Sequence, residues 1–163
     1  MSRAELWVVK IFPRDSVNDP LGRIAYNDIK DLGFDQIKAV IALPTYVIKG
    51  KITEQDLKKV CDELLVDPII QTYQYSKSNK GFIYDSDWVV EVNLKPGVTD
   101  ATGETTLQAI RVLEVKGVVS VSSGTTYLLY GDVEEDVIKT IAVKSLANPI
   151  IQDFHYYRGK SRR

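Results

Sequence analysis

The sequence contains one pattern twice, and the second copy follows the first at a constant offset of 81 residues. Trp7-Val8-Val9 aligns with Trp88-Val89-Val90, and the segment 67–71 aligns with 148–152, where both copies read Pro-Ile-Ile-Gln. Between residues 7–75 and 88–156 the alignment needs no gap, and more than a quarter of the positions are identical. Two copies of one pattern predict two structural units that pack as a pseudo-symmetric pair.

The repeat divides the chain into three parts. Residues 1–78 form repeat 1, residues 79–86 form a linker, and residues 87–163 form repeat 2. A repeat of this size buries only a thin core by itself, so we expect an interface between the copies to stabilise both. The linker begins with polar residues, but Phe82, Ile83 and Tyr84 predict that its second half packs against the protein.

Each repeat has the pattern strand, helix, strand, strand, helix, strand. In repeat 1, β-branched and aromatic residues predict a first strand at 6–12 and two middle strands at 36–43 and 45–49, separated by Pro44. In repeat 2 the middle strands are expected at 117–122 and 125–130, with Ser123-Gly124 as the turn. Each repeat closes on an alternating strand that follows its Pro-Ile-Ile-Gln segment.

The helices are marked by caps and by one-sided apolar stripes. Asp19 and Asp100 are expected to cap the first helix of each repeat, and Thr53 the second helix of repeat 1, while Asp132 with Glu135 resembles a capping box. The second helices carry apolar residues at helical spacing: Leu57, Val60, Cys61, Leu64 and Leu65, then Ile138, Ile141, Ala142 and Leu146. The predicted fold is therefore α+β, with two tandem βαββαβ units, each an antiparallel sheet with helices on one face.

The residues offer little that suggests catalysis. The single histidine, His155, aligns with Gln74 and is expected on a strand surface, and the single cysteine, Cys61, falls on a core stripe. We find no phosphate-binding loop, dinucleotide fingerprint or metal-spaced cluster, so no catalytic, cofactor or metal residues are predicted. Gly22 and Gly103, inside the first helical turns, indicate close backbone packing or an anion at the helix N-terminus. This pattern favours an interaction module.

Charge and composition restrict the partners. The net charge is −1, and the basic cluster Arg158, Lys160, Arg162 and Arg163 is expected to be a solvated terminus, so we predict no nucleic-acid binding. No apolar run is long enough to span a membrane, and no signal peptide opens the chain. A single cysteine fits a reducing compartment, and we expect the protein in the cytoplasm.

Two segments of repeat 2 carry a family resemblance. The segment 92–104 contains Leu94-Lys95 followed by Val98, Asp100 and Gly103, and the segment 146–154 reads Leu-Ala-Asn-Pro-Ile-Ile-Gln-Asp-Phe. Both resemble PurS, the small subunit of phosphoribosylformylglycinamidine (FGAM) synthase in purine biosynthesis, and 124–131 is similar to the family's turn and third strand. Repeat 1 departs from the pattern at 12–17, which lacks Leu-Lys-Pro, and at 65–67, which reads Leu-Val-Asp.

The resemblance implies a protein without an active site of its own. A PurS subunit bridges a glutaminase subunit (PurQ-like) and an ATP-dependent synthetase subunit (PurL-like), the two active parts of a glutamine amidotransferase type C–N ligase, so that ammonia passes between them. It binds no cofactor, while the complex uses ATP and Mg²⁺, and self-association is possible. The chain resembles either a free-standing tandem PurS or the PurS-like N-terminal part of a large FGAM synthase.

One surface and one alternative function follow from these observations. The loop before the first helix of repeat 2 holds the closest family match, so we expect the partner interface at Lys95, Pro96, Gly97, Asp100 and Gly103. The alternative is a tandem small-molecule-sensing regulatory domain, because related element orders also occur in such domains. A glycine-rich turn between the copies would favour it, and Gly117 and Gly124 occur only in repeat 2.

Overall fold

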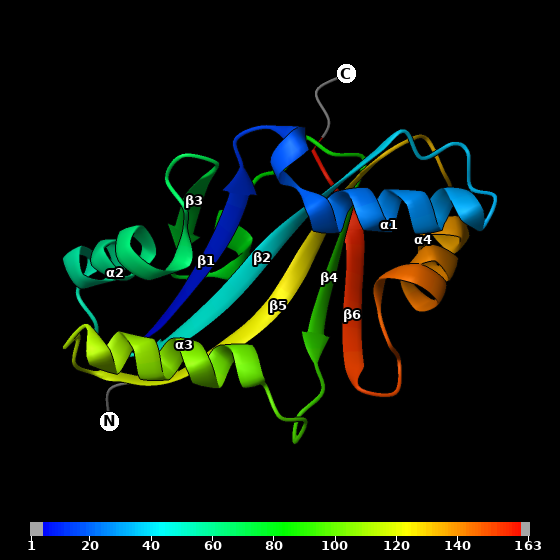
Figure 1. Cartoon of the computed structure of the whole chain (residues 1–163). Coiled ribbons are helices and arrows are strands. Elements are labelled where there is room, and N and C mark those ends of the chain that lie inside the picture. The colour runs from blue at the N-terminus through cyan, green and yellow to red at the C-terminus, as the bar shows by residue number, and fades with distance from the viewer. Residues whose placement is uncertain (1–4, 161–163) are drawn as a thin grey trace. The chain divides into compact units, whose positions relative to one another are not determined.

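The computed structural model describes residues 5–160, and Arg162 and Arg163 of the expected solvated terminus lie outside this range. Repeat 1 forms strands β1, β2 and β3 and helix α1, followed by a second helix that starts as α-helix α2 and continues as the π-helix η2 (Figure 1). Their bounds are β1 Leu6–Pro13, α1 Pro20–Asp31, β2 Ala39–Gly50, α2 Glu54–Val60, η2 Cys61–Leu65 and β3 Gln71–Ser76. Short 3-10 turns, η1 Ser16–Asn18 and η3 Asn79–Gly81, precede α1 and follow β3.

Repeat 2 forms the same elements in the same order. Their bounds are β4 Trp88–Leu94, α3 Ala101–Val112, β5 Val118–Tyr130, α4 Glu135–Ile141, the π-helix η4 Ala142–Leu146 and β6 Gln152–Arg158. Strand β1 pairs antiparallel with β2 and β3, and β4 pairs antiparallel with β5 and β6. The described strands belong to a six-stranded sheet of order β3-β1-β2-β5-β4-β6, which confirms the predicted α+β class.

The middle strands differ from the prediction. The two strands expected on either side of Pro44 are one strand, β2, and the two expected around Ser123-Gly124 are one strand, β5. A tight hairpin turn would need a positive φ at its glycine, and Gly124 is not among the residues with positive φ. Gly124 instead lies against β4, where a Cβ atom would be 2.7 Å from the carbonyl oxygen of Val92. Each repeat is therefore βαβαβ, with one long middle strand.

The helix caps mostly follow the sequence. The amide of Asp56 donates to Thr53 Oγ1 over 3.1 Å at the start of α2, as predicted. The predicted capping box of Asp132 with Glu135 is wrong, because α4 begins at Glu135 and Glu134 occupies the N-cap without a side-chain cap hydrogen bond. Leu64 and Leu65 of the predicted core stripe are only partly buried, and both lie in the π-helical part of the helix.

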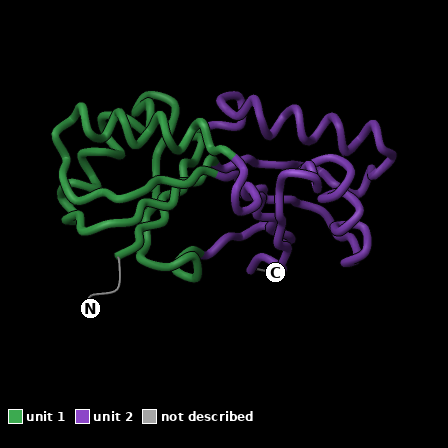
Figure 2. The backbone as a smooth tube through the Cα atoms, turned by 90° about the horizontal axis from the view of Figure 1, so that it is seen from below, with its two compact units in different colours: residues 1–14, 44–82, 99–123 green, residues 15–43, 83–98, 124–163 purple. Residues whose placement is uncertain are grey.

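The compact units of the protein do not coincide with its repeats (Figure 2). Unit 1 comprises residues 1–14, 44–82 and 99–123, and unit 2 comprises 15–43, 83–98 and 124–163. The boundaries in β2 and β5 fall at Pro44 and Gly124, the two places where the sequence predicted turns. Each long middle strand therefore begins in one unit and ends in the other, and the predicted linker passes from unit 1 to unit 2 after Phe82.

Each unit has a core built from both repeats. In unit 1, side chains of β1 and α2 from repeat 1 pack with Ile110 of α3 and Val121 of β5 from repeat 2. In unit 2, Trp88 and side chains of α4 from repeat 2 pack with Ala25 and Ile29 of α1 from repeat 1. The first helices are thus exchanged: α1 contacts η4 in unit 2, and α3 contacts η2 in unit 1.

Candidate functional site

Asp19 joins the N-terminus of α1 to strand β2 within unit 2. Its Oδ1 accepts a hydrogen bond from the Gly22 amide over 2.8 Å, which confirms the predicted cap. Its Oδ2 accepts a second hydrogen bond from the Ala42 amide in β2 over 2.9 Å, which sequence reasoning missed. The side chain is buried, and both oxygens are used inside the protein. The structure therefore gives Asp19 a structural role.

Asp100 makes the equivalent link within unit 1. Its Oδ1 accepts from the Gly103 amide over 2.9 Å, and its two oxygens accept from the backbone amide and hydroxyl of Ser123 over 2.6 Å each. Partial burial acts to raise the pKa of Asp100, but the hydrogen bonds from Ser123 and Gly103 outweigh it and lower the pKa below its usual value. Burial and the nearby Asp100 charge raise the pKa of Tyr46, which comes from the other repeat.

Gly22 and Gly103 are explained by close packing of the first helices on the sheet. A Cβ atom at Gly22 would lie 2.7 Å from the carbonyl oxygen of Val40, and one at Gly103 would collide with the carbonyl oxygen of Val121. Both glycines are buried. Of the two predicted explanations, the contacts support packing rather than an anion site, because Asp19 and Asp100 already accept from the amides of these residues.

Gly117 and Gly124, which have no glycine counterpart in repeat 1, are also explained by packing. Gly117 has a φ of +95°, which favours glycine, and a Cβ atom there would collide with the carbonyl oxygen of Lys51 in the same unit. Gly124 approaches β4 in unit 2 in the same close manner. Close approach of neighbouring backbone therefore explains both Gly117 and Gly124, the glycines that could have supported a ligand-sensing turn.

The five residues predicted as a partner interface fall into two groups. Lys95, Pro96 and Gly97 belong to unit 2, where Pro96 and Gly97 are exposed and the Lys95 amide donates to the Ile151 carbonyl over 2.8 Å. Asp100 and Gly103 belong to unit 1, and Gly103 is buried. The loop 95–97 is thus the accessible part of the predicted surface.

The isolated histidine and cysteine are where the sequence placed them. His155 lies on strand β6 and is exposed to solvent. Cys61 is fully buried in the core of unit 1, and this burial, with a smaller contribution from the charge of Asp62, raises the pKa of its thiol to about 12. Within residues 5–160, no group of three or more His, Cys, Asp or Glu side chains could hold a metal ion. In the same range, no helix has both the length and the apolar character needed to cross a membrane.

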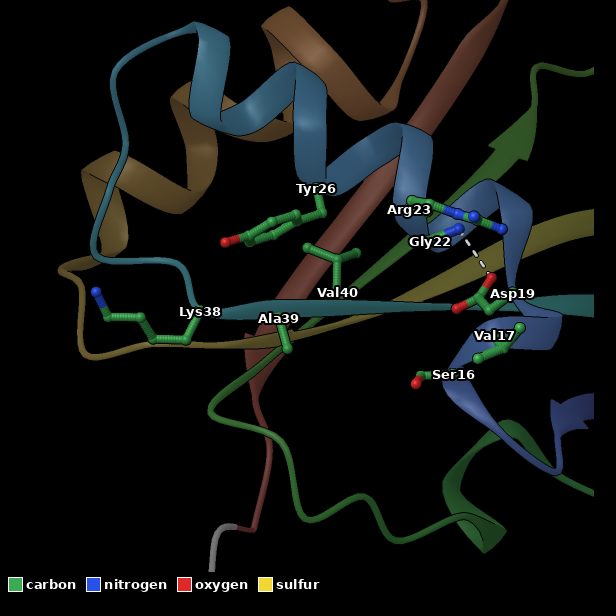
Figure 3. A pocket seen from close by; sticks show the side chains of 9 residues that line it. All are labelled: Ser16, Val17, Asp19, Gly22, Arg23, Tyr26, Lys38, Ala39 and Val40. Carbon is green, nitrogen blue, oxygen red and sulfur yellow. Dashed lines mark hydrogen bonds between the residues drawn. The ribbon is translucent and has the colours of Figure 1, made fainter.

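A pocket of about 360 Å³ lies between α1 and the start of β2 in unit 2 (Figure 3). Tyr26 of α1 and Val40 of β2 point toward one another, and Arg23 and Lys38 lie at opposite ends of the view. Lys38 Nζ donates to the Asp35 carbonyl over 2.9 Å, and Lys30 Nζ lies 5.5 Å from the centre of the Tyr26 ring. The pocket thus combines an apolar wall with cationic side chains.

Sequence reasoning did not predict this pocket, although the internal alignment carries a signal for it. Arg23, Tyr26 and Lys38 align with Glu104, Leu107 and Val119 of repeat 2. The two copies therefore agree at the structural positions Asp19 and Gly22 but differ in charge around them. This difference in charge at equivalent positions is the signal in the sequence that could have pointed to the pocket.

Comparison with known proteins shows that each repeat matches the same protein family. The PurS family, described as phosphoribosylformylglycinamidine (FGAM) synthase, matches the chain twice, at residues 6–79 and 87–158. A curated relative, the phosphoribosylformylglycinamidine synthase subunit PurS of Archaeoglobus fulgidus, is 39% identical over 72 residues, which cover 40% of this chain and 88% of that protein. One PurS protein thus corresponds to about one repeat. The chain belongs to the PurS family and carries the family's unit twice in tandem.

Proposed function

We propose that this chain is a non-catalytic PurS component of FGAM synthase in the cytoplasm, where it holds a glutaminase subunit and an ATP-dependent synthetase subunit together for ammonia transfer. The observation that carries the proposal is the double match to the PurS family over nearly the whole chain. In this proposal ATP and Mg²⁺ act on the synthetase subunit, and this chain contributes surfaces to the complex.

The exchanged first helices support a role for the duplication. Each core contains side chains from both repeats, so neither repeat completes a unit without the other. A single chain therefore supplies in fixed proportion what two separate PurS copies would have to supply by association. Once linked, the two copies are free to differ on their surfaces, as they do around the pocket of unit 2.

Omission of the chain from the reconstituted synthase tests the proposal. We expect glutamine-dependent synthesis of the amidine product to fall by at least about tenfold, because ammonia transfer requires the two active sites to be held in place. With ammonium salts as the nitrogen source we expect a smaller loss, since the synthetase then needs no glutaminase. The measurement is the rate of product formation with each nitrogen source, with and without the chain.

The same assay separates coupling from support of the synthetase fold. An equal loss with glutamine and with ammonia would contradict the coupling role, because the chain would then stabilise the synthetase itself. Glutamine-dependent activity that does not change on omission would contradict membership of the complex altogether.

The loop 95–97 is the first proposed contact surface, and charge reversal at Lys95 tests it. The Lys95 backbone amide is fixed by the Ile151 carbonyl and does not depend on the side chain. We therefore expect Lys95→Glu to remain folded and to bind its partner subunit about 3- to 10-fold more weakly, as is usual for a charge at the edge of an interface. Gel filtration and titration calorimetry with each purified subunit measure the effect.

Lys59→Glu is the matched control for this variant. Lys59 is an exposed lysine of α2 in unit 1, remote in sequence from the predicted interface. Equal affinities of the wild-type chain and a folded Lys95→Glu protein for both subunits would exclude the loop as a contact surface.

A further inference from the structure

The indole N–H of Trp7 is a buried donor that has no acceptor in the part of the chain that the structure describes. Trp7 is 7% exposed, and its Nε1 makes no hydrogen bond within residues 5–160. The paired residue in unit 2, Trp88, donates from its Nε1 to the Val133 carbonyl over 3.1 Å. Buried indole nitrogens usually have an acceptor. The protein therefore satisfies this donor in unit 2 and leaves it for another acceptor in unit 1.

A pocket of about 410 Å³ in unit 1 borders this tryptophan. Trp7 and Ile52 both line the pocket, and they also pack together in the core of unit 1. Ile52 is the counterpart of Val133, whose carbonyl accepts from the equivalent indole in unit 2. The indole edge that carries the donor thus faces the Ile52 side, where the pocket lies. A ligand seated against Ile52 would place an acceptor at the Trp7 N–H.

Neighbouring side chains hold the Trp7 indole in place. The Tyr75 ring packs edge-on against it with the ring centres 5.7 Å apart, and Lys77 Nζ lies 5.1 Å from the centre of the indole. The Tyr75 hydroxyl in turn donates to Glu54 Oε1 over 2.6 Å. The donor is therefore fixed before a ligand arrives, which lowers the entropic cost of binding.

The charges at the pocket suit a ligand that carries both a carboxylate and an ammonium group. Lys51 and Lys77 line the pocket, and together with the Trp7 N–H they are donors for a carboxylate. Glu5 and Glu54 also line it. Their carboxylates attract an ammonium group and oppose a ligand with negative charge alone, such as phosphate. A free α-amino acid has both required groups on adjacent atoms.

We propose that this pocket of unit 1 binds a free α-amino acid. The carboxylate of the ligand accepts from the Trp7 indole and from the ammonium groups of Lys51 and Lys77. Its own ammonium group donates to the carboxylates of Glu5 and Glu54. The inference goes beyond the proposed function, because it gives a chain without an active site a small-molecule ligand of its own.

The two tryptophans provide a direct measurement, because heteronuclear NMR of the full chain reports each indole N–H separately. At a modest ligand efficiency an amino acid binds with a Kd of about 1 mM, so each of the common amino acids is added singly up to about 10 mM. We expect at least one of them to shift the Trp7 indole signal in a saturable manner. The Trp88 signal is expected to stay unchanged, because that indole already donates to the Val133 carbonyl. Trp88→Phe assigns the two signals.

Two substitutions in the pocket test where the ligand lies. Lys51→Asp introduces the residue of the paired position, Asp132, and reverses one charge of the pocket. The Lys51 amide donates to the Gly117 carbonyl over 3.0 Å, and the substitution keeps this backbone bond. We expect Lys51→Asp to bind the amino acid at least about tenfold more weakly, as when a charged hydrogen-bond partner is lost. Trp7→Phe keeps an aromatic ring without the donor, and a similar loss is expected in ligand-observed NMR.

Lys59→Asp is the matched control. Lys59 is an exposed lysine of α2 in the same unit, and it does not line the pocket. This variant makes the same change of charge as Lys51→Asp and is expected to bind the amino acid as the wild-type chain does. Because Lys51 is exposed, Lys51→Asp keeps the test valid if Trp7→Phe fails to fold.

The experiment uses this chain alone, so its outcome does not depend on whether the chain bridges two subunits. A Trp7 signal that no amino acid shifts would overturn the inference and would leave solvent as the acceptor. Acetate or inorganic phosphate that binds as tightly as the amino acid would make the pocket a simple anion site and would also overturn it. Unchanged affinity in Lys51→Asp would place the ligand elsewhere and contradict the proposal. Saturable binding that is weakened in Lys51→Asp, with Lys59→Asp unaffected, supports it.

Discussion

Replacing Asp19 by alanine is expected to lower the free energy of unfolding by about 2–4 kcal/mol, since it removes a helix cap and leaves two buried amides without an acceptor. The two amides belong to Gly22 in α1 and Ala42 in β2, and Asp19 itself is buried. The loss should appear as a lower midpoint in urea unfolding. Asp100→Ala is expected to cost less, because Asp100 is only partly buried and the Ser123 hydroxyl it releases can bond to water.

Asp15→Ala is the control for this prediction. Asp15 is an exposed aspartate whose side chain accepts from the Val17 amide over 3.1 Å at the start of η1. Its replacement is expected to cost less than about 1 kcal/mol, as for a weak exposed cap. If Asp19→Ala and Asp15→Ala lowered stability equally, the link between α1 and β2 would have no special importance.

Ile29→Ala is expected to destabilise unit 2, to which most of repeat 2 contributes, although Ile29 belongs to repeat 1. Ile29 is fully buried in the core of unit 2 with Trp88, Ile138 and Ile141. Truncation of such a side chain usually costs about 2–5 kcal/mol because it leaves a cavity. Hydrogen exchange should therefore accelerate in β4 and β6 more than in β1 and β3, since protection reports local stability.

Ile110→Ala is the equivalent substitution in repeat 2, and it provides the second half of this test. Ile110 aligns with Ile29 but is buried in unit 1, against side chains of β1 and α2. It is expected to accelerate exchange mainly in β1 and β3. If each variant instead affected the strands of its own repeat, or both affected all strands equally, the exchange of first helices would be wrong.

Local features of the fold followed from the sequence because they depend on neighbouring residues. Asp19 and Thr53 cap the helices that they were expected to cap, since an N-cap needs only an acceptor side chain and the amides two or three positions later. The burial of Cys61 followed from the apolar stripe of its helix. The family followed from short segments of repeat 2, and the double match confirms it.

The sequence predicted only part of the candidate functional site, namely the loop 95–97 and not the pocket of unit 2. Val17, Arg23 and Lys38 lie in different elements, and only the fold of unit 2 brings them to one pocket. Lys95 and Gly103 were grouped because they belong to one segment that resembles the family, yet the chain passes from unit 2 to unit 1 between them. Sequence proximity is a poor guide at such a crossing, because a few residues of extended chain reach a different unit.

The sequence by itself determined that this protein is built from two copies of an α+β unit, with its caps, apolar stripes and family. Only the tertiary structure decided that Pro44 and Ser123-Gly124 lie inside continuous strands and that the first helices are exchanged between the repeats. The physical reason is the duplication. Because α1 and α3 carry the same inward residues, Gly22 with Ile29 and Gly103 with Ile110, either helix suits either sheet, and local patterns cannot distinguish packing within a repeat from packing across repeats.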